Sequence, residues 1–154
     1  LQKLKKMSAH YKLLIVGEGP LESELHKKAK QLHLESEVYF TGLCSDTADC
    51  YSAMDAFLLP SVYEGLPLVG IEAQANSLPC FVSNHVAPEL NISNNVYFIP
   101  IDQGGEIWAQ SIHEILQKGQ RAVCPFPQAY DIKYAAKSLE ERYTYLLAQK
   151  KKSS

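Results

Sequence analysis

The chain has 154 residues with 15 basic and 17 acidic side chains, which leave a formal net charge of −2 at pH 7. This length suits one domain with an ordinary core, and the balanced charge provides no basic surface for nucleic acid. No apolar run approaches the roughly 18–20 residues of a membrane span, and the first residues do not resemble a signal peptide. We therefore expect a soluble, cytoplasmic domain without a nucleic-acid partner.

The cysteines show neither a CxxC pair nor a metal-ligand spacing with the five histidines; they are Cys44, Cys50, Cys80 and Cys124. This pattern is typical of free thiols in a reducing compartment and does not indicate a zinc site. Cys44 has no histidine or other base near it in the sequence, so we expect a bystander thiol there.

Strands and helices alternate along most of the chain. Residues 1–9 have the spacing of the end of a helix, and residues 11–16 contain a continuous apolar run typical of a strand buried on both faces. Gly17-Glu18-Gly19-Pro20 follows, and then a helix is predicted whose apolar stripe is Leu21, Leu25, Ala29 and Leu32.

Further strands are predicted at residues 38–42, 56–60, 80–83 and 96–99. Ser45 or Asp46 is expected to cap a helix that runs through Met54. Two C-terminal helices are indicated by apolar stripes, one of Trp108, Ile112, Ile115 and Leu116, the other of Ala136, Leu139, Tyr143, Leu146 and Leu147. The sequence therefore predicts a doubly wound, Rossmann-like α/β domain: a parallel sheet with helices on both faces.

The segment Ser61–Glu72 joins the third strand to a helix that opens near Pro67, where a proline costs little. The free amides and the dipole at the start of this helix favour an anionic ligand. Glu64 precedes the helix and Glu72 lies inside it, so both could reach one ligand from different sides. The plainer interpretation is a helix-start carboxylate at Glu64 and a solvated carboxylate at Glu72.

Three loops follow strands: Gly17–Pro20, Thr41–Ser45 and Ser61–Leu68. Ligands of parallel sheets bind beyond the carboxyl ends of the strands, so we expect these loops to share one rim. The Gly-x-Gly loop could hold a phosphate or sugar, or could be a tight turn. It does not complete the dinucleotide fingerprint, because Glu22 stands at the third glycine position, and this disfavours a dehydrogenase.

Three segments together resemble the C-terminal, donor-binding domain of GT-B glycosyltransferases, in particular the retaining family 4 group ("glycosyl transferases group 1"). They are Leu14–Pro20, Phe40–Gly42 and Leu59–Leu68 followed by Glu72 and Ala73. The family's Glu-x7-Glu pattern corresponds to Glu64 and Glu72. Other segments are similar to bacterial capsular or exopolysaccharide enzymes, namely Glu72–Ala75, Leu78–Cys80, Pro88–Leu90 and Tyr130–Ile132.

The resemblance implies a role for each matching residue. Glu72 would bind the ribose hydroxyls of a nucleotide-sugar donor, and Glu64, the catalytic candidate, would contact the transferred sugar. The other donor-binding candidates are Gly65, Leu66, Pro67 and Leu68 along the sugar and diphosphate, Gly17 and Gly19 at the diphosphate, and Gly42, Leu43 and Cys44 near the base. No metal or cofactor is expected, since helix amides and basic side chains would stabilise the leaving diphosphate.

Several parts of the family pattern are absent from this sequence: the first strand of the sheet, the Arg and Lys that clamp the diphosphate, and the acceptor domain. Residues 1–154 would then be one donor-binding domain, inactive alone. Either neighbouring strands close the gap left by the first strand or another chain fills it. Ser77 stands where relatives often have Gly, so this position is expected to be strained or the helix to end differently.

The resemblance therefore implies a retaining, hexosyl-type glycosyltransferase that uses a UDP-sugar and a glycan or lipid-linked acceptor in surface polysaccharide assembly. It would work in the cytoplasm at the inner face of the membrane; peripheral membrane association and self-association of the fragment stay open. The alternative is a non-catalytic nucleotide- or sugar-binding module that keeps the donor pocket. A receiver-like signalling domain is disfavoured because Leu59-Pro60-Ser61 occupies the place of a phosphorylatable Asp.

Overall fold

The computed structural model describes residues 1–8, 10–119 and 126–152, and the chain divides into two compact units, Leu1–Cys124 and Pro125–Ser154. Cys124 lies outside the described residues. No helix in the described part of the chain combines the length and the apolarity that a membrane span requires. The expectation of one domain over residues 1–154 stays a prediction.

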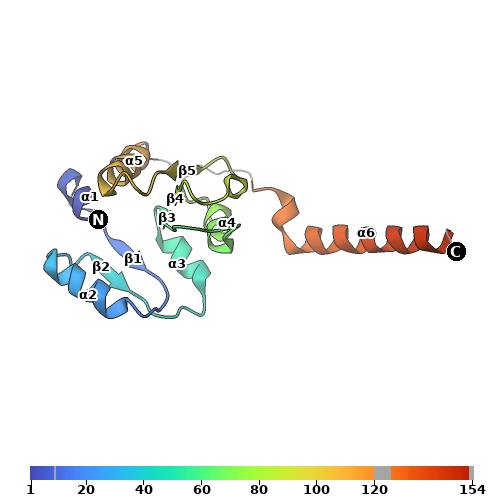
Figure 1. The fold of residues 1–154 in the computed structure, drawn as a ribbon, viewed down its shortest axis with the longest axis horizontal. Helices are drawn as coiled ribbons and strands as arrows, with labels where there is room; N and C mark the ends of the chain where they lie inside the picture. The colour runs from blue at the N-terminus through green and yellow to red at the C-terminus, as the bar shows by residue number, and fades with distance from the viewer. Residues whose placement is uncertain (9, 120–125, 153–154) are drawn as a thin grey trace. The chain divides into compact units, whose positions relative to one another are not determined.

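The first unit alternates strands and helices as expected (Figure 1). Its elements in chain order are α1 (Gln2–Met7), β1 (Leu13–Ile15), α2 (Glu22–Gln31), β2 (Val38–Phe40), α3 (Thr47–Ala53), β3 (Phe57–Leu59), α4 (Leu68–Ala75), β4 (Cys80–Ser83), the 3-10 helix η1 (Pro88–Leu90), β5 (Val96–Ile99) and α5 (Gly105–Gln117). The first three strands are shorter than predicted, because the residues at their ends are not paired in the ladder.

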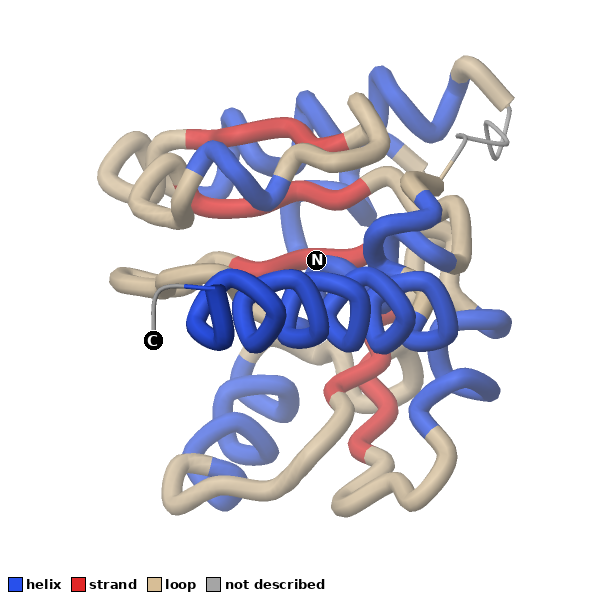
Figure 2. The backbone as a smooth tube through the Cα atoms, turned by 90° about the vertical axis from the view of Figure 1, so that its right-hand side faces the viewer, coloured by secondary structure: helices blue, strands red, loops and turns tan. Residues whose placement is uncertain are grey.

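All strand pairs are parallel, and helices cover both faces of the three-stranded sheet β3–β4–β5 (Figure 2). The side chains of β4 divide between two cores as strand geometry requires. Cys80 and Val82 join a core with Tyr51 of α3 and Ala73 of α4. Phe81 points to the other face, into a core that α1 and α5 cover with Leu4, Trp108, Ala109 and Ile112. The predicted doubly wound parallel class is confirmed.

The strands nevertheless form two separate sheets, β1–β2 and β3–β4–β5. The amide of Leu13 donates to Glu37 O at 2.8 Å and Ile15 O accepts from Thr41 N at 3.0 Å, so the main chain of Leu14, between them, faces away from β2. By the same alternation, the bond from Phe57 N to Pro79 O at 3.0 Å turns the main chain of Leu58 away from β4.

Both of these strand edges line one cleft of about 1570 Å³. Among the described residues, the neighbouring strands therefore do not close the gap that the absent first strand was expected to leave.

The two-stranded sheet covers little of α2: Ala29 is buried, but Leu25 is 43% exposed and Leu21 lies before the helix. The stripe predicted for this helix is thus only partly covered.

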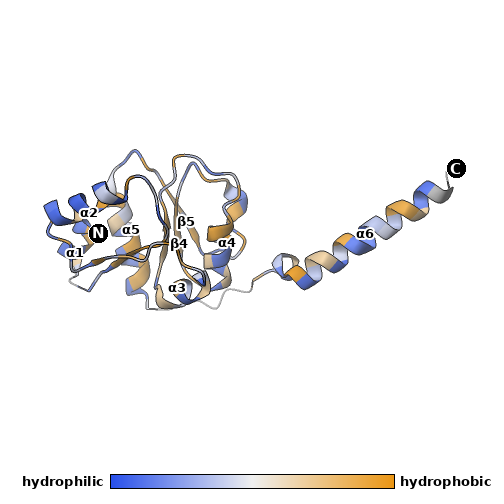
Figure 3. Ribbon diagram, turned by 90° about the horizontal axis from the view of Figure 1, so that it is seen from below, coloured by the Kyte–Doolittle hydropathy of each residue, from blue (hydrophilic) through white to orange (hydrophobic). Residues whose placement is uncertain are grey.

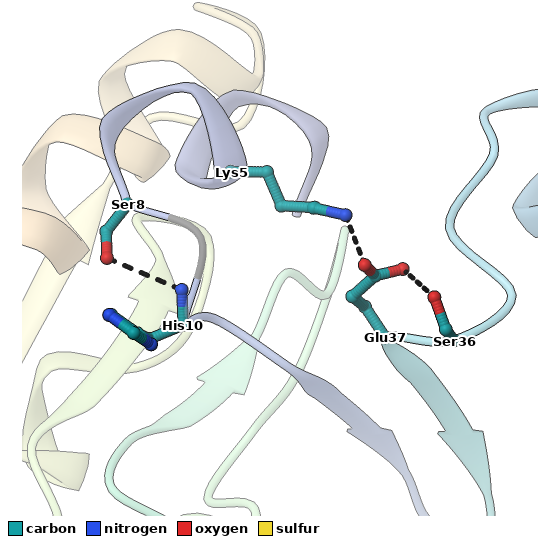
Figure 4. Close-up of polar contacts among 5 residues, drawn as sticks. All are labelled: Lys5, Ser8, His10, Ser36 and Glu37. Atoms are coloured by element: carbon teal, nitrogen blue, oxygen red, sulfur yellow. Dashed lines mark hydrogen bonds and ion pairs between the residues drawn. The ribbon is translucent and has the colours of Figure 1, made fainter.

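Helix α1 is attached to the first unit by one apolar side chain and by ion pairs. Leu4 is buried in the core that contains Trp108. Lys5 forms an ion pair with Glu37 at the start of β2, as Figure 4 shows, and Lys3 pairs with Glu106 of α5. The bond with Lys5 is the main cause that holds the pKa of the Glu37 carboxyl below its usual value. Lys3 and Lys5 therefore lie on the surface of α1 and form ion pairs with neighbouring elements.

The second unit contains η2 (Gln128–Tyr130) and α6 (Ile132–Lys152). Apolar and polar residues are interspersed along α6 (Figure 3). Its 21 residues agree with the sequence, which indicates a helix of about a dozen residues or more. The apolar side chains of its predicted stripe are exposed: Leu139, Tyr143, Leu146 and Leu147.

The buried side chain of Gln74, 1% exposed, joins α4 to the segment after η1. Its Nε2 donates to Gly70 O at 2.9 Å and to Leu90 O at 2.8 Å. Its Oε1 accepts from Ile92 N at 3.2 Å and from the amide and hydroxyl of Ser93 at 3.1 and 2.8 Å. Every polar atom of the amide is therefore satisfied, as a buried polar group requires. Gly70 assists this packing, because a Cβ there would lie 2.9 Å from Leu90 Cδ1.

Gln74→Leu should destabilise the fold by about 3 kcal/mol, because buried main-chain groups of residues 90–93 would lose their partner. The measurement is urea unfolding followed by circular dichroism. The matched control is Gln110→Leu on α5, an exposed residue whose amide bonds only Glu114 at 2.9 Å among the described contacts. A loss of equal size in both variants would contradict the role of the network.

Helix α4 ends in a Schellman motif whose left-handed residue is a serine. Leu78 N donates to Ala73 O at 3.1 Å and Ser77 N donates to Gln74 O at 2.8 Å. Ser77 has φ +58°, a conformation that glycine adopts without steric cost. The strain expected at this position is confirmed, and the buried Leu78 that follows holds the turn in place.

Ser77→Gly should stabilise the protein by about 0.5–1 kcal/mol, since relief of the left-handed strain exceeds the added freedom of the unfolded chain. Thermal unfolding is the measurement. Ser77→Ala keeps the Cβ and should give no gain, so a stabilisation shared by both variants would contradict this explanation.

Candidate functional site

The loops after β1 and β2 meet at two glycines. Gly17 N donates to Gly42 O at 2.9 Å, and the two residues form an antiparallel bridge. Their φ angles of +107° and +63° lie in the region that favours glycine. Gly19 continues the first loop, and a Cβ there would meet no atom within 4 Å. The first two predicted loops therefore lie side by side, with open space above Gly19.

The loop after β2 leads into α3 through a side-chain cap. Asp46 Oδ1 accepts from Ala48 N at 3.0 Å, which decides between the two caps predicted for this helix. Cys44 lies just before the cap, and its Sγ is 3.0 Å from Asp46 O and 3.3 Å from Cys50 Sγ. Leu43 is exposed. The Cys44 thiol, expected to be a bystander, is thus beside a second thiol from α3.

Tyr51 connects α3 to Glu72. Its ring is buried in the core, and its hydroxyl donates to Glu72 Oε2 at 2.9 Å and lies 3.2 Å from Val69 O. Burial, and then the hydrogen bond to Glu72, raise the pKa of the Tyr51 hydroxyl. A carboxylate has about four lone-pair sites, so Glu72 keeps acceptor capacity for ligand hydroxyls.

The turn that carries Glu64 is held from the loop after β4. Glu64 forms a parallel bridge with Val86, and its Oε1 accepts from Ser61 Oγ at 3.1 Å. His85 Nδ1 lies 2.9 Å from Val62 O, so this nitrogen carries the proton and donates to the carbonyl. The His85 side chain therefore supports the turn that carries Glu64.

Helix α4 begins as predicted, with Pro67 as its N-cap and without a side-chain cap. The first intrahelical bond runs from Gly70 N to Pro67 O at 3.0 Å. The amides of Leu68 and Val69 precede this bond and belong to the first turn, which lacks intrahelical partners. Leu66 and Leu68 are exposed, at 47% and 70%. The helix start therefore offers donors to an anion at an accessible surface.

The structure brings part of the predicted site together in the cleft between the two sheets. Its lining includes Gly17, Leu43, Cys44, Tyr51 and Val69. Glu72 is connected to this lining by the hydrogen bond from the Tyr51 hydroxyl to its carboxylate. Of the other candidates, Gly19, Gly42 and Glu72 are not in the lining of the cleft. The candidates from Glu64 to Leu68 are not in the lining either, and they form the turn that directly precedes Val69.

Sequence reasoning missed Tyr51 and the supporting role of His85. A buried tyrosine hydroxyl needs a hydrogen-bond partner, but 21 residues separate Tyr51 from Glu72 and nothing in the pattern links them. Within the described residues, no three His, Cys, Asp or Glu side chains group as metal ligands. The expectation that the site needs no metal or cofactor stays a prediction.

Residues 1–139 match the protein family described as Glycosyl transferases group 1. EpsF of Bacillus subtilis (strain 168), which is named as a glycosyltransferase, is 32% identical over 118 residues, or 76% of this chain and 31% of that protein. The amylovoran biosynthesis glycosyltransferase AmsD of Erwinia amylovora is 28% identical over 110 residues, or 71% of this chain and 31% of that protein.

The fold is similar to the crystal structure of the pneumococcal O-GlcNAc transferase GtfA in complex with UDP and GlcNAc. The TM-score is 0.74 at 21% identity, over 96% of this chain and 31% of that chain. The chain thus spans about a third of the length of these relatives. The likeness to GtfA shows that the chain has the fold of one half of a GT-B glycosyltransferase. Since the family match covers most of the sequence, the chain belongs to the glycosyl transferases group 1 family.

Proposed function

We propose that this chain is the donor-binding part of a retaining glycosyltransferase that transfers a hexosyl group from a UDP-sugar. The observation that carries the proposal is the Glu72 carboxylate, oriented by Tyr51 one turn inside α4 and beside a helix start with free amides. A carboxylate suits two adjacent ribose hydroxyls, and helix-start amides suit a diphosphate. Glu64, on the turn before the helix, contacts the transferred sugar.

Support for the donor comes from GtfA, whose crystal structure is a complex with UDP and GlcNAc. Support for polysaccharide assembly comes from AmsD, which is named for amylovoran biosynthesis. The acceptor is then a glycan or a lipid-linked sugar, bound by a part of the enzyme outside this chain, and the reaction takes place in the cytoplasm at the inner face of the membrane. The described chain alone is inactive in transfer, and it needs no metal.

Glu72→Ala should weaken UDP binding at least about tenfold, because hydrogen bonds to a charged group are lost. Glu64→Ala should leave UDP affinity within about twofold but reduce the preference among UDP-sugars about fivefold. Ligand-observed NMR with UDP, GDP, ADP and their common sugars measures both effects. Equal losses for UDP and for every UDP-sugar in both variants would contradict this division of roles, and no binding of any nucleotide by the unmodified chain would contradict the donor site.

Tyr51→Phe should weaken UDP binding about three- to tenfold, less than Glu72→Ala, because the carboxylate stays but loses the bond that orients it. Isothermal titration with UDP is the measurement. In the Glu72→Ala background the tyrosine substitution should have no further effect on affinity. Additive losses in the double variant would show that Tyr51 acts independently of Glu72.

A further inference from the structure

Two thiols of the first unit face each other beside the candidate donor site. Cys44 Sγ, in the loop after β2, lies 3.3 Å from Cys50 Sγ, one turn inside α3. Both residues are partly buried, and both line the open cleft between the sheets. A reagent in solution can therefore reach this pair.

The local structure holds the sulfurs close to bonding distance. The Asp46 cap fixes the start of α3, which places Cys50 opposite the loop that carries Cys44. A disulfide bond needs a separation of about 2.05 Å, so the sulfurs need to approach by little more than about 1 Å. The six-residue spacing makes the loop short, so the approach is shared between the loop that carries Cys44 and the first turn of α3, which carries Cys50.

The other described cysteine, Cys80, differs from this pair in its burial and reactivity. Cys80 is fully buried in the core, and burial raises the pKa of its thiol to about 12. A thiol in this state is inert toward oxidants, because the thiolate is the reactive form. Oxidation of the described thiols should therefore be selective for Cys44 and Cys50.

The thiol pair is directly connected to Glu72 through α3. Cys50 precedes Tyr51, whose hydroxyl holds the Glu72 carboxylate at 2.9 Å and lies 3.2 Å from Val69 O. Any displacement of the first turns of α3 that draws Cys50 toward Cys44 moves the tyrosine as well. A hydrogen bond loses most of its strength over such changes in distance and angle.

We propose that Cys44 and Cys50 are a redox-sensitive pair that forms a reversible disulfide bond with peroxide, and that this bond displaces Tyr51 and weakens nucleotide binding at Glu72. The effect on nucleotide rests on the proposed function, whereas the disulfide and the displacement do not. This places an oxidative modification site next to the donor site.

The reaction balances with hydrogen peroxide as the oxidant. Peroxide oxidises the Cys44 thiol to a sulfenic acid, its O–O bond breaks, and one water is released. The Cys50 sulfur then attacks the Cys44 sulfur, the S–O bond breaks, and hydroxide leaves with the Cys50 proton as a second water. The hydrogen bond to Cys44 raises the pKa of Cys50, so the Cys44 sulfur is the one that attacks peroxide first. A dithiol reductant reverses the bond.

The test uses the 154-residue chain with Cys124→Ser, so that a thiol outside the described residues does not interfere. The protein is treated with hydrogen peroxide and digested, and the peptides are analysed by mass spectrometry. We expect a loss of about 2 Da from the intact chain, a cross-link between Cys44 and Cys50, and a free thiol at Cys80. Dithiothreitol should restore the original mass.

Two further measurements test whether the disulfide bond changes the candidate donor site. In ¹⁵N NMR spectra, oxidation should shift the amide signals of Tyr51, Val69 and Glu72, and UDP affinity should fall about five- to tenfold. Cys50→Ser protein, treated in the same way, should show neither the cross-link nor these changes relative to its own reduced state. Ser52→Cys in the Cys50→Ser background controls for a thiol at another position of α3.

The outcomes separate the two proposals. If peroxide gives sulfinic acid or no cross-link between Cys44 and Cys50, the inference is wrong. If the cross-link forms without shifts at Tyr51 and Glu72 or without loss of UDP affinity, the coupling is wrong. If reduced protein binds no nucleotide, the proposed function fails, while mass and NMR still decide whether the disulfide forms and moves Tyr51.

Discussion

The first unit depends on one buried amide. Gln74 satisfies five main-chain and side-chain groups from inside α4, and so holds the segment after η1 against that helix. The same helix presents Val69 and Glu72 toward Tyr51, and its C-terminal turn delivers Leu78 into the core ahead of β4. A network of this kind stabilises only when it is complete, because an unpaired polar group in a dry core is costly. The position of Glu72 in the candidate site and the packing of Leu78 in the core therefore both depend on the helix that the Gln74 network holds in place.

Much of this arrangement was predictable because it is local. Continuous apolar runs indicated where the strands lie, and Pro67 marked the start of α4. The strand predicted to be buried on both faces, β1, is only partly buried. The strain at Ser77 was one of two outcomes expected from the family resemblance. The partners of Gln74, Tyr51 and His85 were not predictable. Each of these side chains meets groups 16 or more residues away in sequence, and a polar residue inside an apolar pattern does not indicate which group satisfies it.

The separation into two sheets has a clear physical consequence for the cleft. The main chains of Leu14 and Leu58 have no strand partner on this side among the described residues and face the open space between β1 and β3. The cleft is therefore lined both by apolar side chains and by strand edges with hydrogen-bonding capacity. The predicted donor residues Gly17, Leu43 and Cys44 lie where the loops of the smaller sheet meet this cleft.

The two glutamates of the family pattern are supported in different ways, and this difference bears on the roles proposed for them. Glu72 is part of a regular helix, and a buried tyrosine from another element orients it, so its position changes only if α3 or α4 moves. Glu64 lies in a turn, where Ser61 bonds its carboxylate locally and His85 and Val86 hold the backbone. A carboxylate on a rigid element suits the part of a donor that is common to all substrates, namely the nucleotide. A carboxylate on a turn can adjust to the sugar, which is the part that differs between donors.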